Sequence, residues 1–513
     1  MAYWRPHTLC GPGCCAFNTE ADELLLASTP DQSGINQNRL GMEKFLYVLK
    51  EQGGPVMAPG ASNNTEFLEL LDIHLPEIKI YRTGRIQTSP GVSEVEGTPT
   101  EYFRTVGAII ALIAAWAYLN GDEFGIVAVS AGARGPLSID KIPGKFINMG
   151  GKPGEYKAFC EEFSKCCSTD EDWWAMMVFL AIHDVGKSDD FRNTVNATLP
   201  LPMRSDDHDR VLAAALNDPH LKQTLLPSVH QLSRKRQESL AAGFATGFQL
   251  PQLGQGEIAC INFRGLLEMP ERYLADGTLR TYLYHSIFDV AGATSNELFL
   301  YPLAIAPVYM GFTSAMNDLL EQLVGGDRPV ERALYFDFLY INFAKSYPEF
   351  VETVFKPMAE SKVFRHETGL ALLRILALTR NTYKNPTKLI EALTGDFQHL
   401  VQEMAGSPVG PQIMLYYGPD FLRMGLGEDL TDPTGENMRN ALEALDLIFK
   451  VGRKNLMAAR SGDYQYQLNV QHAVTEIKKA GKLWLGGKQL RELVQNATVK
   501  NNALCTEGML VLS

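Results

Sequence analysis

The sequence is poor in cysteine and in long apolar segments. Eight cysteines among 513 residues are too few for a dense disulfide framework, and this usage is typical of a reducing compartment. The longest apolar run, Val106 to Leu119, covers fourteen residues, fewer than the roughly 18 that a membrane span needs. The first residues lack the charged and apolar regions of a secretory signal. We therefore expect a cytoplasmic protein that is not in a membrane, with residues 106–119 forming a buried helix.

Positive charge is also in deficit. Lys and Arg number 47 against 59 Asp and Glu, which gives a formal net charge of −12. Proteins that coat DNA or an anionic membrane usually carry a basic field over their surface, so we expect neither as a partner. A local basic track is still compatible with this balance, and a dense triplet is Arg234-Lys235-Arg236. The alternative for this triplet is the solvated face of a helix.

The overall composition and the chain length are those of a folded protein with more than one domain. Hydrophobic residues make up 45% and charged residues 21% of the chain, and its length exceeds the roughly 250 to 300 residues of a single core. Apolar residues recur at helical spacing from residue 101 onward, so we predict a mainly α fold. The predicted regions are a mixed N-terminal region (1–100), a helical core (101–326) and a C-terminal helical region (327–513). Between Gly406 and Thr434, the density of Gly, Pro and Asp predicts a long irregular excursion.

The strongest local signal is the segment His183-Asp184-Val185-Gly186-Lys187, which closes an apolar helix. An adjacent His and Asp offer two ligands to one divalent cation, and Lys187 can reach an anionic oxygen. Further along, His285 and Asp289 are four residues apart, which places both on one face of a helix. We predict that His183, Asp184 and Asp289 converge on one buried polar pocket.

This segment resembles the signature of HD-domain proteins, an all-helical superfamily of metal-dependent phosphohydrolases and some di-iron oxygenases. The resemblance implies that the core at 101–326 is HD-domain-like. It also implies a divalent metal (Mn, Fe or Mg) with ligands at His183, Asp184, His208 and Asp289. The superfamily has an earlier His ligand as well, and the helical pattern from Tyr102 to Leu119 contains no histidine. Two alternatives stay open: an HD-like scaffold that binds no metal, and a non-catalytic HD-like interaction protein.

Acidic residues gather around this motif. Asp189 and Asp190 follow it directly, and Asp206 and Asp207 precede His208. Paired carboxylates can act as general acids and bases or bind a guanidinium group, whose flat fork they match. We predict that the carboxylates of Asp189 and Asp190 face the His-Asp pocket. The alternative is that these residues cap the helices that follow them.

A second motif, the run from Gly125 to Gly132, is an apolar strand pattern that ends in Ser-x-Gly. It is similar to the nucleophile elbow of serine hydrolases, in which a sharp turn exposes a serine. The leading glycine of that motif is replaced by Ala128, and Gly135-Pro136 follows too soon for the required helix. A serine hydrolase with Ser130 as its nucleophile is therefore a lesser alternative.

The overall character of the chain, together with the segment from His183 to Asp190, resembles fungal arginine-containing cyclodipeptide synthases. These enzymes of secondary metabolism join two aminoacyl groups, delivered by tRNA, into a cyclic dipeptide. The resemblance implies aminoacyl-tRNA as the partner and requires no cofactor. It places the catalytic groups among His183, Asp184, Lys187, Asp189 and Asp190, and substrate binding at Arg234, Lys235, Arg236, Asp206 and Asp207. The Asp-Asp-x-x-Glu pattern of that family is absent, because neither Asp pair is followed by the Glu. We predict this function first and an HD-type metal-dependent phosphohydrolase or oxygenase as the alternative.

Overall fold

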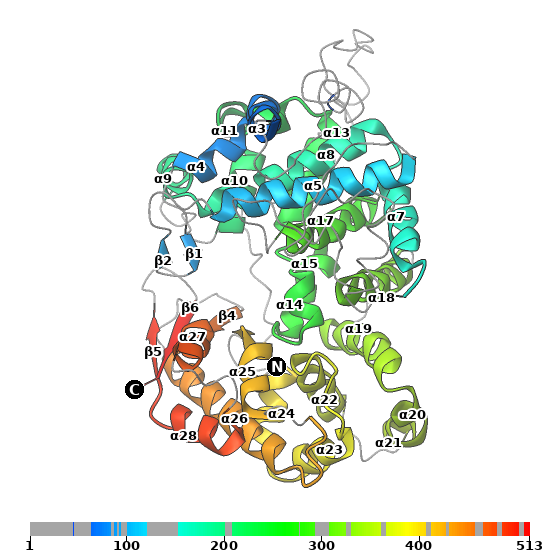
Figure 1. The fold of residues 1–513 in the computed structure, drawn as a ribbon, viewed down its shortest axis with the longest axis vertical. Coiled ribbons are helices and arrows are strands. Elements are labelled where there is room, and N and C mark those ends of the chain that lie inside the picture. The colour runs from blue at the N-terminus through cyan, green and yellow to red at the C-terminus, as the bar shows by residue number, and fades with distance from the viewer. Residues whose placement is uncertain are drawn as a thin grey trace, which may run out of the picture.

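The fold is mainly α, as predicted. The computed structural model describes residues 45, 63–83, 87–89, 92–93, 100–120, 152–200, 208–275, 277–292, 307–324, 330–360, 366–406, 412–426, 430–456, 465–479, 485–501 and 507–512. Within these residues, helices predominate and the strands form a two-stranded and a four-stranded sheet. Figure 1 shows a helical unit that contains α5, α8 and α17 above a second unit that contains the four-stranded sheet.

The helical unit is built around α5 (Thr100–Asn120), the helix predicted from the apolar run. Nearly all of its side chains from Val106 to Ala117 are buried, because a helix that is apolar on every side finds low-energy surroundings only inside a core. By length and composition alone α5 could cross a membrane, yet 78% of its apolar window is buried inside the protein. It packs against α7 (Glu155–Cys166), α8 (Asp170–Ile182) and α17 (Thr278–Gly292).

The start of α8 is fixed by a capping box. Thr169 accepts a hydrogen bond from the backbone N–H of Asp172, and the Asp172 carboxylate accepts one from the N–H of Thr169. The helix then runs buried to Ile182, so that His183 follows at its C-terminal end. Other elements of this unit are α3 (Asn63–His74), η1 (Pro76–Lys79), α4 (Ile80–Thr83), β1 (Gln87–Ser89), β2 (Val92–Ser93), η3 (Val185–Lys187), α9 (Asp189–Thr198), α10 (His208–Asn217), α11 (Pro219–Leu225), α12 (Pro227–His230) and α13 (Arg234–Ala245).

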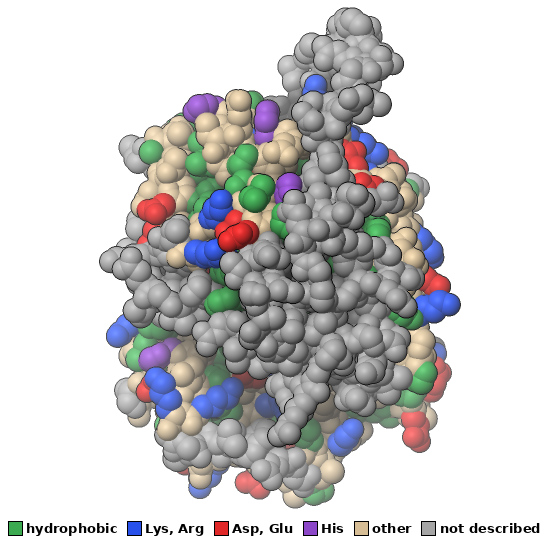
Figure 2. Space-filling view, turned by 45° about the horizontal axis from the view of Figure 1, so that its top comes forward, with side chains coloured by type: hydrophobic (Ala, Val, Ile, Leu, Met, Phe, Trp, Pro, Cys, Tyr) green, Lys and Arg blue, Asp and Glu red, His purple; other side chains and the backbone are tan. Residues whose placement is uncertain are grey.

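The described surface carries charges of both signs. Figure 2 shows Lys and Arg side chains interspersed with Asp and Glu side chains over the described part of one face. Such mixing produces no field of one sign over that part of the surface.

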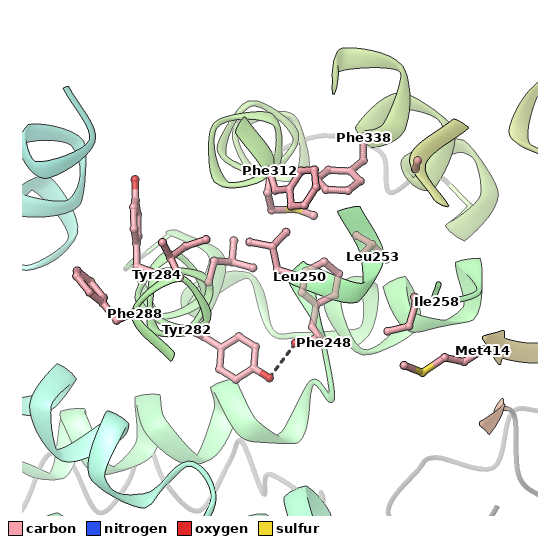
Figure 3. Packing of buried hydrophobic residues seen from close by; sticks show 14 of the residues in the cluster. Phe248, Leu250, Leu253, Ile258, Tyr282, Tyr284, Phe288, Phe312, Phe338 and Met414 are labelled. Atoms are coloured by element: carbon pink, nitrogen blue, oxygen red, sulfur yellow. Dashed lines mark hydrogen bonds between the residues drawn. The ribbon is translucent and has the colours of Figure 1, made fainter. Parts of the chain in front are cut away.

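A continuous hydrophobic core joins the two units. Figure 3 shows apolar side chains from Tyr284 and Phe288 of α17, through Leu250 and Leu253, to Met414 in the sheet, and the Tyr282 hydroxyl donates a 2.9 Å hydrogen bond to the Phe248 carbonyl. The predicted boundary at 326/327 falls outside the described residues and stays a prediction. The connecting elements are α14 (Leu250–Gly254), η5 (Cys260–Asn262), α15 (Phe263–Glu268), α16 (Glu271–Ala275), α18 (Pro307–Leu323), α19 (Glu331–Ser346), α20 (Pro348–Phe350), η6 (Val351–Phe355) and α21 (Lys356–Glu360).

The second unit contains a sheet that the sequence patterns did not predict. Its strand order is β3-β4-β6-β5, with β3, β4 and β6 parallel and β5 antiparallel to β6. The segment expected to be irregular, 406–434, contains β3 (Gln412–Tyr416) and α25 (Gly418–Leu426), so that expectation is wrong in this part. The other elements are α22 (His366–Leu378), α23 (Pro386–Gly395), α24 (Gln398–Met404), α26 (Glu436–Leu456), β4 (Gln465–Asn469), α27 (Gln471–Lys479), α28 (Gly487–Val494), β5 (Thr498–Asn501) and β6 (Glu507–Val511).

Glu257 links the units through its backbone and its side chain. Its carbonyl accepts a 2.9 Å hydrogen bond from the N–H of Leu415 in β3, and its carboxyl group binds the backbone N–H groups of Tyr417 and Gly418. Burial nevertheless raises the pKa of this carboxyl from 4.5 to about 8. The folded protein therefore holds a proton, between those two pH values, that the unfolded chain releases.

The stability of the protein should consequently fall as the pH rises from about 4.5 to about 8. A Glu257→Gln variant cannot ionise, so it should match the wild type at pH 5 and exceed it at pH 8 by on the order of a few kcal/mol. Denaturant unfolding at both pH values measures this difference. Replacing the exposed Glu349 by Gln is the control and should leave the wild-type pH profile unchanged. Parallel pH profiles for Glu257→Gln and the wild type would contradict the assignment.

Candidate active site

His183 lies between two carboxylates where α8 and α17 meet. Its Nδ1 is 2.7 Å from the carbonyl oxygen of Leu180 and donates to it, so Nε2 points away from its own helix. Nε2 lies 3.0 Å from Oδ1 of Asp289 and 3.3 Å from Oδ2 of Asp184. The prediction that the side chains of His183, Asp184 and Asp289 lie together is therefore confirmed.

Each charge of this trio shifts the pKa of its neighbours. Burial would lower the pKa of His183, but Asp184 and Asp289 outweigh that effect and raise the pKa well above its usual value. Burial would likewise raise the pKa of Asp289, but the His183 cation lowers it to about 2. The trio therefore consists of an imidazolium that donates to carboxylates, and the Asp289 side chain keeps 27% of its surface exposed.

A second layer of charge extends from this trio to α5. The Lys187 ammonium lies 2.6 Å from Oδ2 of Asp184 and 3.3 Å from Oε1 of Glu101, and Nη1 of Arg104 lies 2.7 Å from the same Glu101 oxygen. Glu101 is only 1% exposed. The sequence did not predict Glu101 and Arg104 as site residues, because the HD resemblance implies a histidine on this helix. The acidic residue just before the apolar run was the available signal.

Glu101 and Asp184 form a carboxyl pair. The second oxygen of Glu101, Oε2, is buried and has no hydrogen-bond donor among the described residues. Burial raises the pKa of Glu101, Lys187 lowers it in part, and Asp184 raises it again. Burial and Asp184 therefore favour the protonated form of Glu101, and the cations Lys187 and Arg104 favour the ionised form.

Two further histidines border the cluster. His208, at the start of α10, has Nε2 3.8 Å from Oδ1 of Asp184 and 3.4 Å from Asp209, and its side chain is 37% exposed, so it lies at the rim. His285 stacks on Phe179 with ring centroids 4.2 Å apart. Burial and the nearby His183 cation lower the pKa of His285 to about 4, which keeps it neutral.

Other predicted site residues lie elsewhere. Asp189 forms an ion pair with Arg192 of its own helix, and Asp190 is exposed, so the prediction that both carboxylates face the pocket is wrong. They occupy the first turn of α9, where the N-terminal end of a helix favours acidic side chains, and Ser188 caps that helix. Asp206, Asp207 and Ser130 lie outside the described residues.

The basic triplet does not form a continuous track. Arg234 is exposed and pairs with Glu238 at 2.7 Å, and Lys235 is exposed. Arg236 instead forms an ion pair with Asp172, whose side chain is 4% exposed. The substrate-binding role implied for the triplet is therefore corrected at Arg236, because this side chain neutralises a buried carboxylate.

Replacing Arg236 by Gln should destabilise the protein, because the Asp172 charge would stay buried without its partner. We expect a loss of about 2–3 kcal/mol, less than the roughly 3–5 typical of fully buried pairs, since Arg236 is 20% exposed. Its neighbour Lys235 is the matched control, and Lys235→Gln should change the unfolding free energy by less than about 0.5 kcal/mol. Equal stability of the two variants in denaturant unfolding would refute the role given to Arg236.

The side chains of His183, Asp184 and Asp289 are also spaced as ligands of one metal ion. One atom each from His183, Asp184 and Asp289 lies within 4.8 Å of the others, so one ion could contact all three. An imidazole nitrogen and two carboxylate oxygens suit Mn, Fe or Mg. The donor set fits such an ion in kind and spacing, but Lys187 already lies 2.6 Å from one donor oxygen and the His183 proton would have to leave.

Comparison with known proteins places this chain in a family. The profile that matches residues 152–479 is described as a family of unknown function, DUF6829. The match covers more than half of the chain. The chain belongs to this family. The matched region includes His183, Asp184, Lys187 and Asp289 as well as strands β3 and β4, whereas Glu101 and Arg104 precede it. Neither the curated proteins nor the solved structures gave a match.

Proposed function

We propose that this protein is an acid–base enzyme that makes a cyclic dipeptide from two aminoacyl groups delivered on tRNA, one of them arginyl. The observation that carries the proposal is the buried imidazolium of His183, which contacts two carboxylates and lies beside Lys187. This arrangement places a proton donor and a proton acceptor side by side. The resemblance of the segment from His183 to Asp190 to arginine-containing cyclodipeptide synthases supplies the substrate class.

The chemistry requires little beyond positioning and proton transfer. An aminoacyl ester is already activated, so its carbonyl carbon can be attacked by the amine of the second aminoacyl group. The C–N bond forms as the ester C–O bond breaks. In this proposal Asp289, the more exposed carboxylate of the trio, accepts the proton of the amine as His183 protonates the departing ribose oxygen. The two transfers occur together, because Asp289 becomes a stronger base when the His183 cation that lowers its pKa gives up its proton. A second transfer of the same kind closes the ring.

The contact with tRNA is confined, in this proposal, to the acceptor end that carries the amino acid. The mixed charges in Figure 2 and the pairing of Arg236 with Asp172 favour few phosphate contacts. Product formation should therefore depend weakly on salt. An Arg234→Gln, Lys235→Gln double variant, which spares Arg236, should leave that dependence unchanged.

The decisive experiment uses the purified full chain with arginyl-tRNA and a mixture of other aminoacyl-tRNAs, and detects small products by mass spectrometry. We expect a cyclic dipeptide that contains arginine and that disappears when ribonuclease is added first. Formation of the product after complete ribonuclease digestion would remove tRNA from the mechanism. Absence of any dipeptide with every aminoacyl-tRNA would refute the proposal.

A metal-dependent phosphohydrolase is the second candidate, favoured by the spacing of the three donor atoms. His183, Asp184 and Asp289 would hold the ion, which would supply polarisation of a phosphoryl oxygen. Metal analysis of the purified protein and assays of phosphate-ester hydrolysis with Mn, Fe or Mg separate the candidates. Dipeptide formation by metal-free protein in EDTA favours the synthase, whereas phosphate release that requires the added ion favours the hydrolase.

A further inference from the structure

The C-terminal end of α8, where His183 lies, is held by hydrogen bonds to its last carbonyl groups. The final carbonyls of a helix lack partners from a following turn, so other donors must satisfy them. The N–H of His183 donates to the Phe179 carbonyl at 3.0 Å, and its Nδ1 donates to the Leu180 carbonyl at 2.7 Å. The next carbonyl, that of Ala181, accepts a 3.2 Å hydrogen bond from the hydroxyl of Tyr81. The end of α8 is therefore tied to a residue 100 positions earlier in the chain.

Tyr81 is itself fixed, because its neighbours on both sides are anchored. Before it, the buried Glu77 in η1 accepts two hydrogen bonds of 2.8 Å, from the N–H and from the hydroxyl of Ser228 in α12. After it, Cζ of Arg82 lies 4.0 Å from the centre of the Tyr102 ring in α5, a cation–π contact. The segment η1 also packs against α8 and α5. Residues 77–82, the N-terminal clamp, therefore hold the Tyr81 hydroxyl in one place relative to α8.

The N-terminal clamp connects the two helices that bring the candidate site together. Through Tyr81 it binds the end of α8, two residues before His183, and through Arg82 it contacts Tyr102 in the first turns of α5. These two regions meet again in the charged cluster, where the Lys187 ammonium lies 3.3 Å from Glu101 of α5. The clamp precedes residues 152–479, the part of the chain that matches the family. It therefore supports the site from outside the matched region.

We propose that Tyr81 is a positioning residue for the proton donor His183. This inference rests on the proposed function, in which His183 protonates the departing ribose oxygen. Because Nδ1 is bound to the carbonyl of the last turn of α8, the direction of Nε2 follows that turn, and the Tyr81 hydroxyl fixes the turn through the Ala181 carbonyl. Nε2 then lies 3.0 Å from Asp289 on α17. A displacement of about 1 Å in a positioned group can lower a rate about 10²-fold, so the donor depends on this support.

The test is Tyr81→Phe, which removes the hydroxyl and keeps the buried ring. The matched control is Tyr335→Phe, because Tyr335 is also buried and its hydroxyl donates to the carbonyls of Leu253 and Ile258 in the region that joins the two units. Both variants leave a buried carbonyl without this donor, so both melting temperatures should fall. At a temperature where circular dichroism shows all proteins folded, kcat of dipeptide formation should fall about 10- to 100-fold in Tyr81→Phe, with KM changed less than about threefold. Tyr335→Phe should keep the wild-type kcat.

Nuclear magnetic resonance of the full chain, labelled with ¹⁵N-histidine and kept in EDTA, tests the position of His183 independently of the reaction. An imidazolium N–H held against a carboxylate should give a resolved proton signal, assigned by its loss in His183→Gln. In Tyr81→Phe this signal should shift and exchange faster with water, whereas Tyr335→Phe should keep the wild-type signal. If this pattern appears while no aminoacyl-tRNA yields a dipeptide, Tyr81 still positions His183 and the proposed function fails. A wild-type His183 signal in Tyr81→Phe, or a wild-type kcat in that variant, would overturn the role of Tyr81.

Discussion

Replacing His183 by Gln should reduce turnover by about 10²- to 10⁴-fold, the range expected when a positioned acid–base group is removed. Gln can still donate one hydrogen bond to Asp289, but it cannot exchange a proton with substrate. Because His183 is also the buried cation that Asp184 and Asp289 contact, the melting temperature should fall as well, so turnover is compared at a temperature where far-ultraviolet circular dichroism shows both proteins folded. Steady-state kinetics and thermal unfolding of the same preparation measure both quantities.

Asp289→Asn should produce a loss of similar size, and combining it with His183→Gln should add little. The reason is that the two groups, 3.0 Å apart, act as one unit in proton transfer. His230, an exposed histidine in the same half of the chain, is the matched control, and His230→Gln should keep wild-type kinetics. Additive losses in the double variant, or full activity in His183→Gln, would show that this trio is not the reaction centre.

Replacing Gly292 by Ala should give the largest loss of stability. The added Cβ would lie 2.2 Å from the Arg104 carbonyl oxygen and 2.6 Å from the Ala108 backbone nitrogen, so α17 would have to move away from α5. These two helices pack together at the centre of the helical unit. Overpacking of a core costs typically about 1–3 kcal/mol, and we expect at least the upper value because both obstacles are backbone atoms. Activity should fall as well, since Asp289 and Arg104 lie on either side of this contact.

Gly395 provides the control for that substitution. It is the last residue of α23, and no atom lies within 4 Å of the position its Cβ would take. Gly395→Ala should therefore be neutral or slightly stabilising, because alanine favours the helix. Denaturant unfolding of Gly292→Ala and Gly395→Ala measures the change in unfolding free energy that each causes. A Gly292→Ala protein as stable as Gly395→Ala would mean that α5 and α17 do not approach as closely as the structure has them.

Local patterns were enough to predict part of the candidate site. The apolar run before His183 predicts a helix that ends at this residue, and the spacing of His285 and Asp289 predicts one helical face. Both predictions depend only on residues within a few turns of each other. The meeting of His183 with Asp289 was expected from the order of the HD signature, which is a resemblance and not a local pattern.

The remaining site residues could not be found in this way, because their partners are far away in the chain. Glu101 and Lys187 are 86 residues apart and meet only because α5 packs beside the end of α8. The acidic residues nearest the motif, Asp189 and Asp190, were favoured by proximity in sequence. The N-terminal end of a helix stabilises acidic side chains without any other partner. Asp189 and Asp190 therefore do not need the pocket, although they are close to the motif in sequence.

The sequence by itself determined that this protein is mainly helical, because the period of its apolar residues is a local property that each helix satisfies alone. Only the tertiary structure decided which charges are paired and where strands form. Strand β3 needs the backbone of β4, more than forty residues later, to satisfy its hydrogen bonds, and it was read as irregular because its own residues carry no sign of that partner. Arg236 likewise looked like a surface cation until the fold placed it against Asp172. A buried charge is stable only when a distant partner neutralises it, and such partners are chosen by packing.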